Sequence, residues 1–235
     1  MALAIEQARS AAPVDIVLVD DHPLLIEGLR AGAARRDLVL VAPSSLAHDD
    51  VAAFVEAVSP VVVVLDYQMP PHGVSTPLIS CLVGHGHKVM VLTATIDDAL
   101  WGSLLAEGAA VVIGKDEAID DVLDCMERVG RGEMVRPALA AAQRRAWAER
   151  SAIKADAAGR FEALTPRERA VAARLVAGTA LKDIATESFV SVATVRSQLK
   201  SIFRKVGVSS QLELVTLARD TGWHGAVISS DGLER

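Results

Sequence analysis

Aromatic residues make up only 3% of this chain of 235 residues, and it holds only two cysteines. With so few rings, a hydrophobic core has to be built from Ala, Val and Leu, since hydrophobic residues still make up 51% of the chain. Cys81 and Cys125 belong to no CxxC pair and to no Cys/His cluster. We therefore expect two reduced thiols that pack in the fold, and nothing supports a disulfide.

Long apolar runs are also absent. None reaches the roughly 18 residues that a membrane-spanning helix needs, and the amino terminus lacks the basic start and long apolar stretch of a signal peptide. We therefore expect a cytoplasmic protein with no membrane partner. There is no glycine-rich phosphate loop and no Ser-His-Asp order with a nucleophile elbow. The sequence thus gives no support for a nucleotide-hydrolysing enzyme with a phosphate loop or for a serine hydrolase.

Charge is unevenly distributed along the sequence, although the whole chain carries only −6. Residues 14–130 hold 6 Lys and Arg against 18 Asp and Glu, a net charge of −12. Residues 131–161 hold 7 against 3, and residues 162–223 hold 9 against 6, so both segments are basic. The length allows two modest domains, and this asymmetry indicates an acidic part joined to a basic part.

Short apolar runs alternate with amphipathic segments through the acidic part, which we assign to residues 14–131 after a loose tail at 1–13. The runs predict strands at 14–19, 38–42, 61–65, 88–92 and 111–113. The segments between and after them predict helices at 23–35, 49–58, 74–84, 97–107 and 118–131. Such alternation is typical of a parallel, doubly wound sheet with right-handed crossovers.

Carboxylates follow two of these strands at the point where each run ends. Asp20 and Asp21 follow the first strand, and Asp66 follows the third. In a sheet of order 2-1-3-4-5 these strands are neighbours, and their carboxyl ends form the edge where such sheets bind ligands. Three clustered carboxylates repel one another and call for a hard cation such as Mg²⁺.

Thr93 follows the fourth strand and Lys115 the fifth, at the same edge of the predicted sheet. The chemistry assigns a role to each group. Asp66 would be a nucleophile that accepts a phosphoryl group, while Asp21, supported by Asp20, would hold Mg²⁺. Lys115 would pair with the phosphate, and the Thr93 hydroxyl would move to hydrogen-bond a phosphoryl oxygen.

The motifs around these residues resemble those of the receiver domain of bacterial two-component response regulators. They are Val19-Asp20-Asp21-His22-Pro23, Leu65-Asp66-Tyr67-Gln68-Met69-Pro70, Leu92-Thr93-Ala94 and Gly114-Lys115. The resemblance implies a flavodoxin-like α/β fold with a five-stranded parallel sheet, and a sensor histidine kinase that phosphorylates Asp66. It also implies that the backbone carbonyl of Gln68 completes the Mg²⁺ site.

One position departs from the receiver pattern. The family usually carries Tyr or Phe three residues before the lysine, where the ring rotates inward as the threonine hydroxyl moves. Here that position is Val112, which has no ring and is stiff about its first torsion. Thr93 and Val112 are therefore the expected switch positions, with an altered relay at the second.

The basic part begins with a segment at 132–160 that has no strand signal. Residues 138–150 are rich in Ala and Arg and indicate a helical linker. Thr165, Pro166 and Glu168 then have the spacing of a helix start with a capping box. We expect an all-α domain at 161–223 and a tail at 224–235. Its helices are predicted at 166–177, 181–187, 192–206 and 211–220.

The predicted helix at 192–206 has one apolar stripe and one basic side. Val195, Leu199, Ile202 and Val206 recur at helical spacing, which predicts a buried face. The short helix before it completes a helix-turn-helix, a unit that places its second helix in the major groove of DNA. The candidate DNA-binding residues are Lys182, Thr194, Arg196, Ser197, Gln198, Lys200, Arg204 and Lys205.

This region resembles the LuxR-type helix-turn-helix. The matching motifs are Leu164-Thr165-Pro166-Arg167-Glu168-Arg169, Lys182-Asp183-Ile184-Ala185, Val190-Ser191-Val192-Ala193-Thr194-Val195-Arg196 and Phe203-Arg204-Lys205-Val206-Gly207-Val208. The resemblance implies a four-helix domain that binds double-stranded DNA as a homodimer through its last helix. Relatives often have His where Gln198 stands, which bears on sequence preference.

Together these features predict a DNA-binding transcriptional response regulator of the NarL/FixJ type, controlled by phosphorylation of Asp66. An alternative keeps the same architecture but places control in a ligand, a partner or the dimer equilibrium, and Val112 motivates it. A phosphatase or phosphotransferase using Asp66 has less support, because Gln68 stands where a second carboxylate would serve as acid and base. We therefore expect no turnover enzyme.

Overall fold

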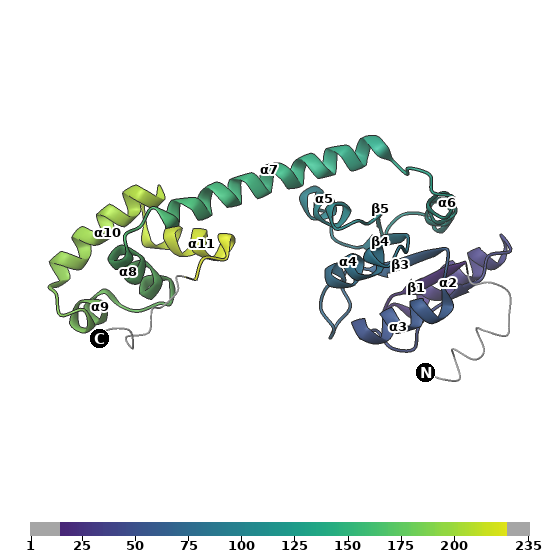
Figure 1. The fold of residues 1–235 in the computed structure, drawn as a ribbon, viewed down its shortest axis with the longest axis horizontal. Coiled ribbons are helices and arrows are strands. Elements are labelled where there is room, and N and C mark those ends of the chain that lie inside the picture. Colours follow the sequence, from purple (N-terminus) through teal and green to yellow (C-terminus); the bar gives the residue numbers. More distant parts are fainter. Residues whose placement is uncertain (1–14, 225–235) are drawn as a thin grey trace. The chain divides into compact units, whose positions relative to one another are not determined.

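The computed structural model describes residues 15–224, which form two compact units that divide between Ala148 and Glu149 (Figure 1). The predicted tail at 1–13, the first residue of the predicted first strand and the segment 225–235 lie outside the described residues. Each unit has its own hydrophobic core, so we describe the two separately.

The first unit is built on a parallel sheet of five strands in the order β2-β1-β3-β4-β5, as predicted. All four strand pairings are parallel. Val, Leu, Ile and Met dominate the strands, and nearly all strand residues are buried, as expected for a sheet covered on both faces. The strands are β1 (Ile16–Val19), β2 (Leu40–Val41), β3 (Val62–Asp66), β4 (Val89–Thr93) and β5 (Val111–Gly114).

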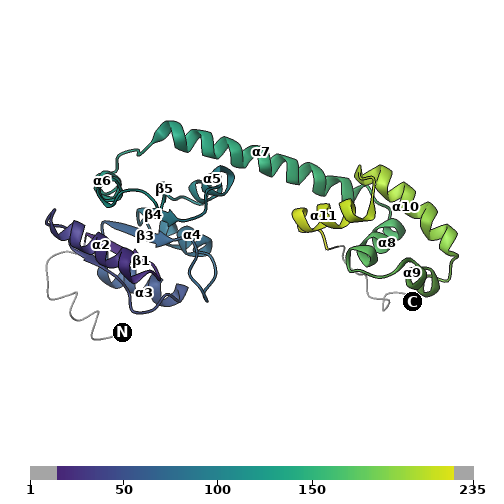
Figure 2. The same ribbon diagram turned by 180° about the vertical axis from the view of Figure 1, so that it is seen from behind.

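Helices cover both faces of this sheet (Figure 2). Side chains of α2 (Pro23–Ala34) and α6 (Ile119–Gly130) share one buried cluster with alternate strand residues. Side chains of α3 (His48–Val58), α4 (Thr76–Gly84) and α5 (Asp98–Ala106) share the other. This arrangement leaves the carboxyl edge of the sheet free of helix packing, so polar side chains can gather there.

Four strands end at other residues than predicted. β2 is shorter than the predicted 38–42, because only Leu40 and Val41 pair with β1. β3, β4 and β5 each extend one residue further, to Asp66, Thr93 and Gly114, because these residues still pair with the neighbouring strand. The register places Asp66 beside Leu92 and Thr93 beside Gly114. Strand ends follow from pairing between distant segments, which a local pattern does not contain.

A single helix, α7 (Pro137–Glu162), replaces the shorter helical segment predicted at 138–150. It is 26 residues long, and Gly159 is its only glycine, so nothing in its sequence breaks the helix before Glu162. Its first turns belong to the first unit, where they pack on α5 at Gly102. The later turns belong to the second unit, where Ala157 and Phe161 are buried.

The second unit contains the four predicted helices α8 (Pro166–Val176), α9 (Leu181–Glu187), α10 (Val192–Val206) and α11 (Gln211–Thr221). The predicted capping box is present: the Glu168 backbone N–H donates to Thr165 Oγ1 at 3.3 Å, and the Thr165 N–H donates to Glu168 Oε2 at 2.9 Å. Phe161 stacks on Trp223 with ring centroids 4.3 Å apart, which fastens the end of α7 to this core.

Both cysteines are free thiols, as predicted. Cys125 is buried on α6, but Cys81 is exposed on α4, so the expectation that both thiols pack inside was wrong for Cys81. Over residues 15–224, no helix combines the length and the apolar character needed to traverse a bilayer.

Candidate functional site

The predicted carboxylates meet at the carboxyl edge of the sheet. β1 and β3 are neighbours with Val19 paired to Leu65, so the residues that follow these two lie side by side. Asp20 is 4% exposed and Asp66 is 3% exposed, whereas Asp21 faces solvent. Two buried carboxylates and a third at the rim thus surround one small volume.

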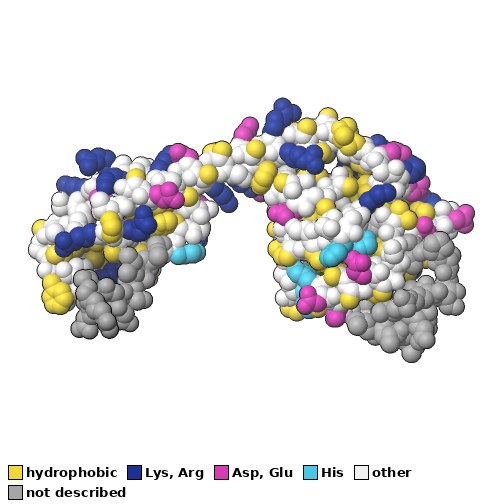
Figure 3. Space-filling view, viewed as in Figure 1, with side chains coloured by type: hydrophobic (Ala, Val, Ile, Leu, Met, Phe, Trp, Pro, Cys, Tyr) yellow, Lys and Arg dark blue, Asp and Glu magenta, His cyan; other side chains and the backbone are white. Residues whose placement is uncertain are grey.

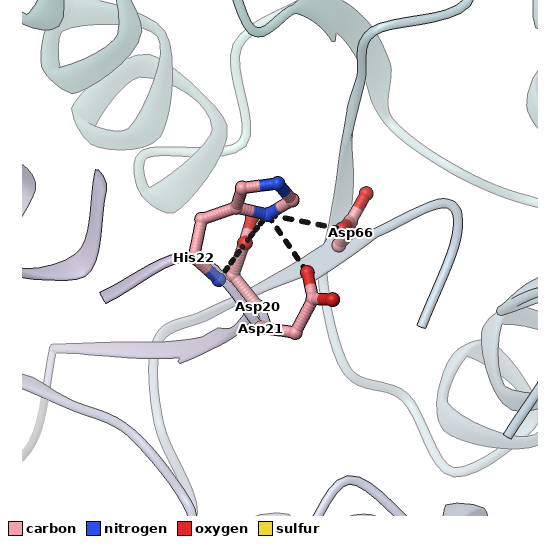
Figure 4. Close-up of side chains that lie close together, drawn as sticks. All are labelled: Asp20, Asp21, His22 and Asp66. Carbon is pink, nitrogen blue, oxygen red and sulfur yellow. Dashed lines mark hydrogen bonds and ion pairs between the residues drawn. The ribbon is translucent and has the colours of Figure 1, made fainter. Parts of the chain in front are cut away.

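This cluster has the composition of a Mg²⁺ site. One ligand atom from each of Asp20, Asp21, His22 and Asp66 can be chosen so that all four lie within 4.8 Å of one another (Figure 4). Carboxylate oxygens are the ligands that Mg²⁺ prefers, with water completing the octahedron. The three carboxylates therefore fit this ion. The predicted ligand at Gln68 is its backbone carbonyl, and its N–H donates to Asp66 Oδ1 at 3.2 Å, which ties this turn to the cluster.

Lys115 supplies the countercharge. Its Nζ lies 2.6 Å from Asp66 Oδ2 and 2.9 Å from Asp20 Oδ2, so one ammonium bridges both buried carboxylates. Burial raises the pKa of Asp66, the hydrogen bond from Lys115 opposes this rise, and the nearby charge of Asp20 adds to it. Burial works against the charged form of Lys115, but its hydrogen bonds to Asp66 and Asp20 hold its pKa above the ordinary value.

His22 belongs to this cluster although sequence reasoning did not select it. Its Nδ1 lies 2.9 Å from Asp20 Oδ1 and 2.7 Å from Asp21 Oδ1 (Figure 4). The same nitrogen lies 3.2 Å from Lys115 Nζ. This histidine has no metal-ligand spacing to a cysteine. Its place directly after two predicted metal ligands is the sequence feature that indicates its proximity to the cluster.

Thr93 is the last residue of β4 and is 2% exposed. Its Oγ1 accepts a hydrogen bond from the N–H of Thr95 at 3.0 Å. Its carbonyl accepts one from the N–H of Lys115 at 2.9 Å, so the backbones of these two site residues are joined directly. The threonine hydroxyl is thus engaged by the loop that leads from β4 to α5.

Val112, the other predicted switch position, is 1% exposed in the middle of β5. It packs in the cluster on the α3–α5 side of the sheet. Its neighbours in sequence, Val111 and Ile113, belong to the cluster on the opposite face, as strand alternation requires. A small aliphatic side chain in this place has no ring to rotate and no hydroxyl to present at the surface.

The second unit presents a basic surface on α10. The four residues of the predicted apolar stripe are buried, so the opposite side of the helix faces outward. Figure 3 shows Lys and Arg side chains over this helix. The exposed candidates are Lys182 on α9 and Thr194, Arg196, Ser197, Lys200 and Arg204 on α10, while Gln198 is half-buried.

Two of the candidate residues also have internal partners. Lys205 Nζ lies 2.7 Å from Glu168 Oε2 on α8 and is half-buried. Thr194 donates its N–H to Ser191 Oγ at 3.1 Å, within the cap of α10. The exposed candidates on α10 are therefore Thr194, Arg196, Ser197, Lys200 and Arg204, whereas Lys205 is half-buried and paired with Glu168.

The chain also matches known proteins at the level of families. Residues 162–218 match the family model described as bacterial regulatory proteins of the luxR family. Over 215 residues the chain is 31% identical to the probable transcriptional regulatory protein NarL of Mycobacterium tuberculosis, covering 87% of this chain and 93% of the relative. The nitrate/nitrite response regulator protein NarL of Escherichia coli is 27% identical over 208 residues, covering 86% and 93%.

Among solved structures, the two-component response regulator RcsB in complex with DNA is similar, with 21% identity and a TM-score of 0.49. That similarity covers 89% of this chain and 99% of the other. The response regulator ChrA of a heme-sensing two-component system is 26% identical with a TM-score of 0.44.

Proposed function

The chain belongs to the NarL type of response regulators, which are DNA-binding transcriptional regulators, and on this premise we propose that phosphorylation of Asp66 controls its binding to DNA. The observation that carries the proposal is the position of Asp66, which is buried between two other carboxylates and paired with Lys115 at 2.6 Å. An aspartate that only caps a turn uses neither a lysine partner nor neighbouring carboxylates. A phosphoryl acceptor uses both, the lysine to pair with the phosphate and the carboxylates to hold a metal ion.

The reaction follows from these groups. A carboxylate oxygen of Asp66 attacks the phosphorus of a phosphohistidine on a sensor histidine kinase. The new O–P bond forms as the P–N bond breaks, and the imidazole leaves with the electron pair and takes up a proton. Lys115 then pairs with an oxygen of the acyl phosphate, having already held Asp66 in position. The product is a phosphoprotein, and the chain carries out no further turnover.

Mg²⁺ is the cofactor in this proposal, held by Asp20, Asp21 and Asp66 with the backbone carbonyl of Gln68. When bound, it neutralises negative charge on the transferring oxygens. The support for it is the composition of the cluster, with three carboxylates whose oxygens can approach within 4.8 Å of one another. Among residues 15–224, Lys115 is the one lysine or arginine with an ion pair to Asp20 or Asp66, so a divalent cation has a clear electrostatic reason to bind.

The second unit binds double-stranded DNA in this proposal, with α10 in the major groove. Arg196 and Lys200 suit guanine edges, and Arg204, Thr194 and Lys182 suit phosphates. We propose a homodimer on a two-fold symmetric site that forms through α11. On that helix Leu212 is 76% exposed, an apolar side chain that a dimer contact would cover.

Phosphorylation would be tested by incubating the full chain with Mg²⁺ and acetyl phosphate and separating the phosphorylated form on a phosphate-affinity gel. We expect a shifted band for the wild type and none for Asp66→Ala. A neighbouring change outside the cluster, Tyr67→Phe, serves as the matched control and should keep the shifted band. A band that persists in Asp66→Ala would show that another residue is the acceptor.

One observation favours a second candidate function, in which the same DNA-binding protein is controlled without phosphate. Val112 is buried and lacks the ring that usually reports phosphorylation. The two candidates differ in one measurement, the DNA affinity of the full chain with and without beryllofluoride and Mg²⁺. An unchanged affinity and oligomeric state would support control by a ligand, a partner protein or the dimer equilibrium.

A further inference from the structure

Thr95 forms two hydrogen bonds that connect Thr93, a predicted switch residue, to Trp101 of α5. Its N–H donates to Thr93 Oγ1 at 3.0 Å. Its carbonyl accepts from Trp101 Nε1 at 2.7 Å. Because both bonds belong to one residue of the β4–α5 loop, a movement of the Thr93 hydroxyl changes the position of the group that holds the indole of Trp101.

The ring of Trp101 lies beside the end of β5. A Cβ atom placed on Gly114 would lie 2.3 Å from Oδ1 of Asp116 and 3.9 Å from the tip of the Trp101 ring, so the indole reaches the residue that precedes Lys115. Trp101 packs on the same buried cluster as Val112. Two small residues of β5, Val112 and Gly114, thus lie beside the one large aromatic ring of α5.

The residue after Trp101 is in direct contact with α7. A Cβ atom on Gly102 would lie 2.0 Å from the carbonyl oxygen of Gln143 and 2.8 Å from Cβ of Trp147. Arg144 reaches the same helix through a hydrogen bond to the carbonyl of Leu105 at 3.5 Å. No side chain separates α5 from α7 at Gly102, so a displacement of α5 has to displace α7 as well.

We propose that Trp101 is the positioning residue that reports phosphorylation in this protein, in place of the aromatic residue absent at position 112. This inference rests on the proposed phosphorylation of Asp66. When the Thr93 hydroxyl turns to donate to a phosphoryl oxygen, Thr95 loses its partner and the loop moves. Trp101 follows through its hydrogen bond to the Thr95 carbonyl, and the contact of Gly102 with α7 passes the movement to the linker helix.

The test uses fluorine NMR of the full chain labelled with 5-fluorotryptophan, with and without Mg²⁺ and beryllofluoride. Three tryptophan signals are expected, from Trp101, Trp147 and Trp223, and single Trp→Phe variants assign them. The bound analogue gives its own fluorine signal in the same spectrum. We expect the Trp101 signal to shift when the analogue binds and the Trp147 signal to follow. Trp223 stacks on Phe161 of α7 in the second unit, so a shift of its signal too would support passage of the movement along α7.

Two results are separable in this spectrum. A signal of bound beryllofluoride together with an unmoved Trp101 signal would overturn this inference and leave the phosphorylation proposal standing. Absence of a bound-analogue signal would overturn both. In Asp66→Ala neither the bound signal nor the tryptophan shift should occur.

A variant tests whether the hydrogen bond itself carries the effect. Trp101→Phe keeps a ring but removes the N–H that Thr95 accepts. We expect beryllofluoride to bind this variant within about twofold of wild type. The change in DNA affinity on binding should fall from at least about fivefold, the lower end of usual allosteric coupling, to less than twofold. The matched variant Trp223→Phe should keep the wild-type response. A full response in Trp101→Phe would overturn the role assigned to the indole N–H.

Discussion

The ammonium nitrogen of Lys205 lies 2.7 Å from Oε2 of Glu168, and this pair joins α10 to α8 inside the DNA-binding unit. The same carboxylate accepts a hydrogen bond from the Thr165 N–H at 2.9 Å and one from Ser201 Oγ at 2.7 Å. The glutamate of the capping box therefore also holds the basic helix in place. A residue predicted to contact DNA thus has an ion-pair partner inside its own domain.

The first prediction concerns acid stability. The hydrogen bond from Lys205, followed by that from the Thr165 backbone, lowers the pKa of Glu168 to about 2. Since an unfolded glutamate has a pKa of about 4.3, the stabilisation is complete above that value and is lost as the pH falls toward 2. Glu168→Gln should lower the free energy of unfolding by about 1–3 kcal/mol at pH 7 and by progressively less below pH 4.

Unfolding of this unit can be followed by the fluorescence of Trp223, which stacks on Phe161 within its core. The difference between wild type and Glu168→Gln should be measured in urea at several pH values. Glu213→Gln is a useful comparison, because the Glu213 carboxylate also accepts hydrogen bonds at a helix start, from the N–H and Oγ of Ser209. Within residues 15–224 it forms no ion pair with a lysine. A Glu168→Gln difference that stays constant down to pH 3 would contradict the assignment.

The second prediction separates two adjacent basic residues of α10. Arg204 is exposed, whereas Lys205 is held by Glu168. Arg204→Ala should weaken DNA binding and reduce the slope of log affinity against log salt by about 0.9, the value for one phosphate contact. Lys205→Ala should leave that slope unchanged and lower the stability of the unit. Fluorescence anisotropy with labelled DNA at several salt concentrations measures both, and equal slopes for the two variants would contradict the distinction.

The third prediction concerns the metal. Mg²⁺ should raise the melting temperature of the first unit, because in the proposed function it binds the folded carboxylate cluster and not the unfolded chain. At ten times its dissociation constant the gain is about 1.4 kcal/mol. Asp21→Asn should reduce this gain by removing one ligand of the cluster. Thermal unfolding with Mg²⁺ or with EDTA measures this gain in stability. The control Asp49→Asn removes an acidic side chain at the start of α3, outside the cluster, and should keep the full stabilisation by Mg²⁺.

The fourth prediction concerns the contact between α5 and α7. Gly102→Ala places a Cβ 2.0 Å from the carbonyl oxygen of Gln143, so the helices have to separate. We expect a loss of about 1–3 kcal/mol from this overpacking, and faster hydrogen exchange in residues 137–148. Gly159→Ala is the matched control. Its Cβ meets nothing within 4 Å in the same long helix, so it should stabilise the protein by about 0.5–1 kcal/mol.

Much of the fold was predictable because its elements carry local signals. The run from Val62 to Leu65 is continuously apolar and consists mostly of β-branched valine, as is typical of a strand buried on both faces. The start of α8 carries its own cap and proline, and α10 has an apolar stripe at helical spacing. These signals depend on residues close in sequence, so the observed bounds of every predicted helix except α7 lie within two residues of the predicted ones.

The acidic cluster was predictable for a different reason. Parallel strands bring their carboxyl ends to one edge, so Asp20 and Asp66 had to meet once β1 and β3 were neighbours. The place of Lys115 follows in the same way from the order of β4 and β5. Chain connectivity alone therefore led from a sequence pattern to a set of neighbouring side chains.

Other contacts arise only when distant segments pack. That His22 turns its Nδ1 into the acidic cluster depends on side-chain rotation, which no spacing encodes. That Lys205 turns to Glu168 depends on how α10 packs across α8. The acidic cluster could thus be foreseen from residues at strand ends, whereas the contact of Gly102 with Gln143 of α7 depends on helix packing between segments some forty residues apart.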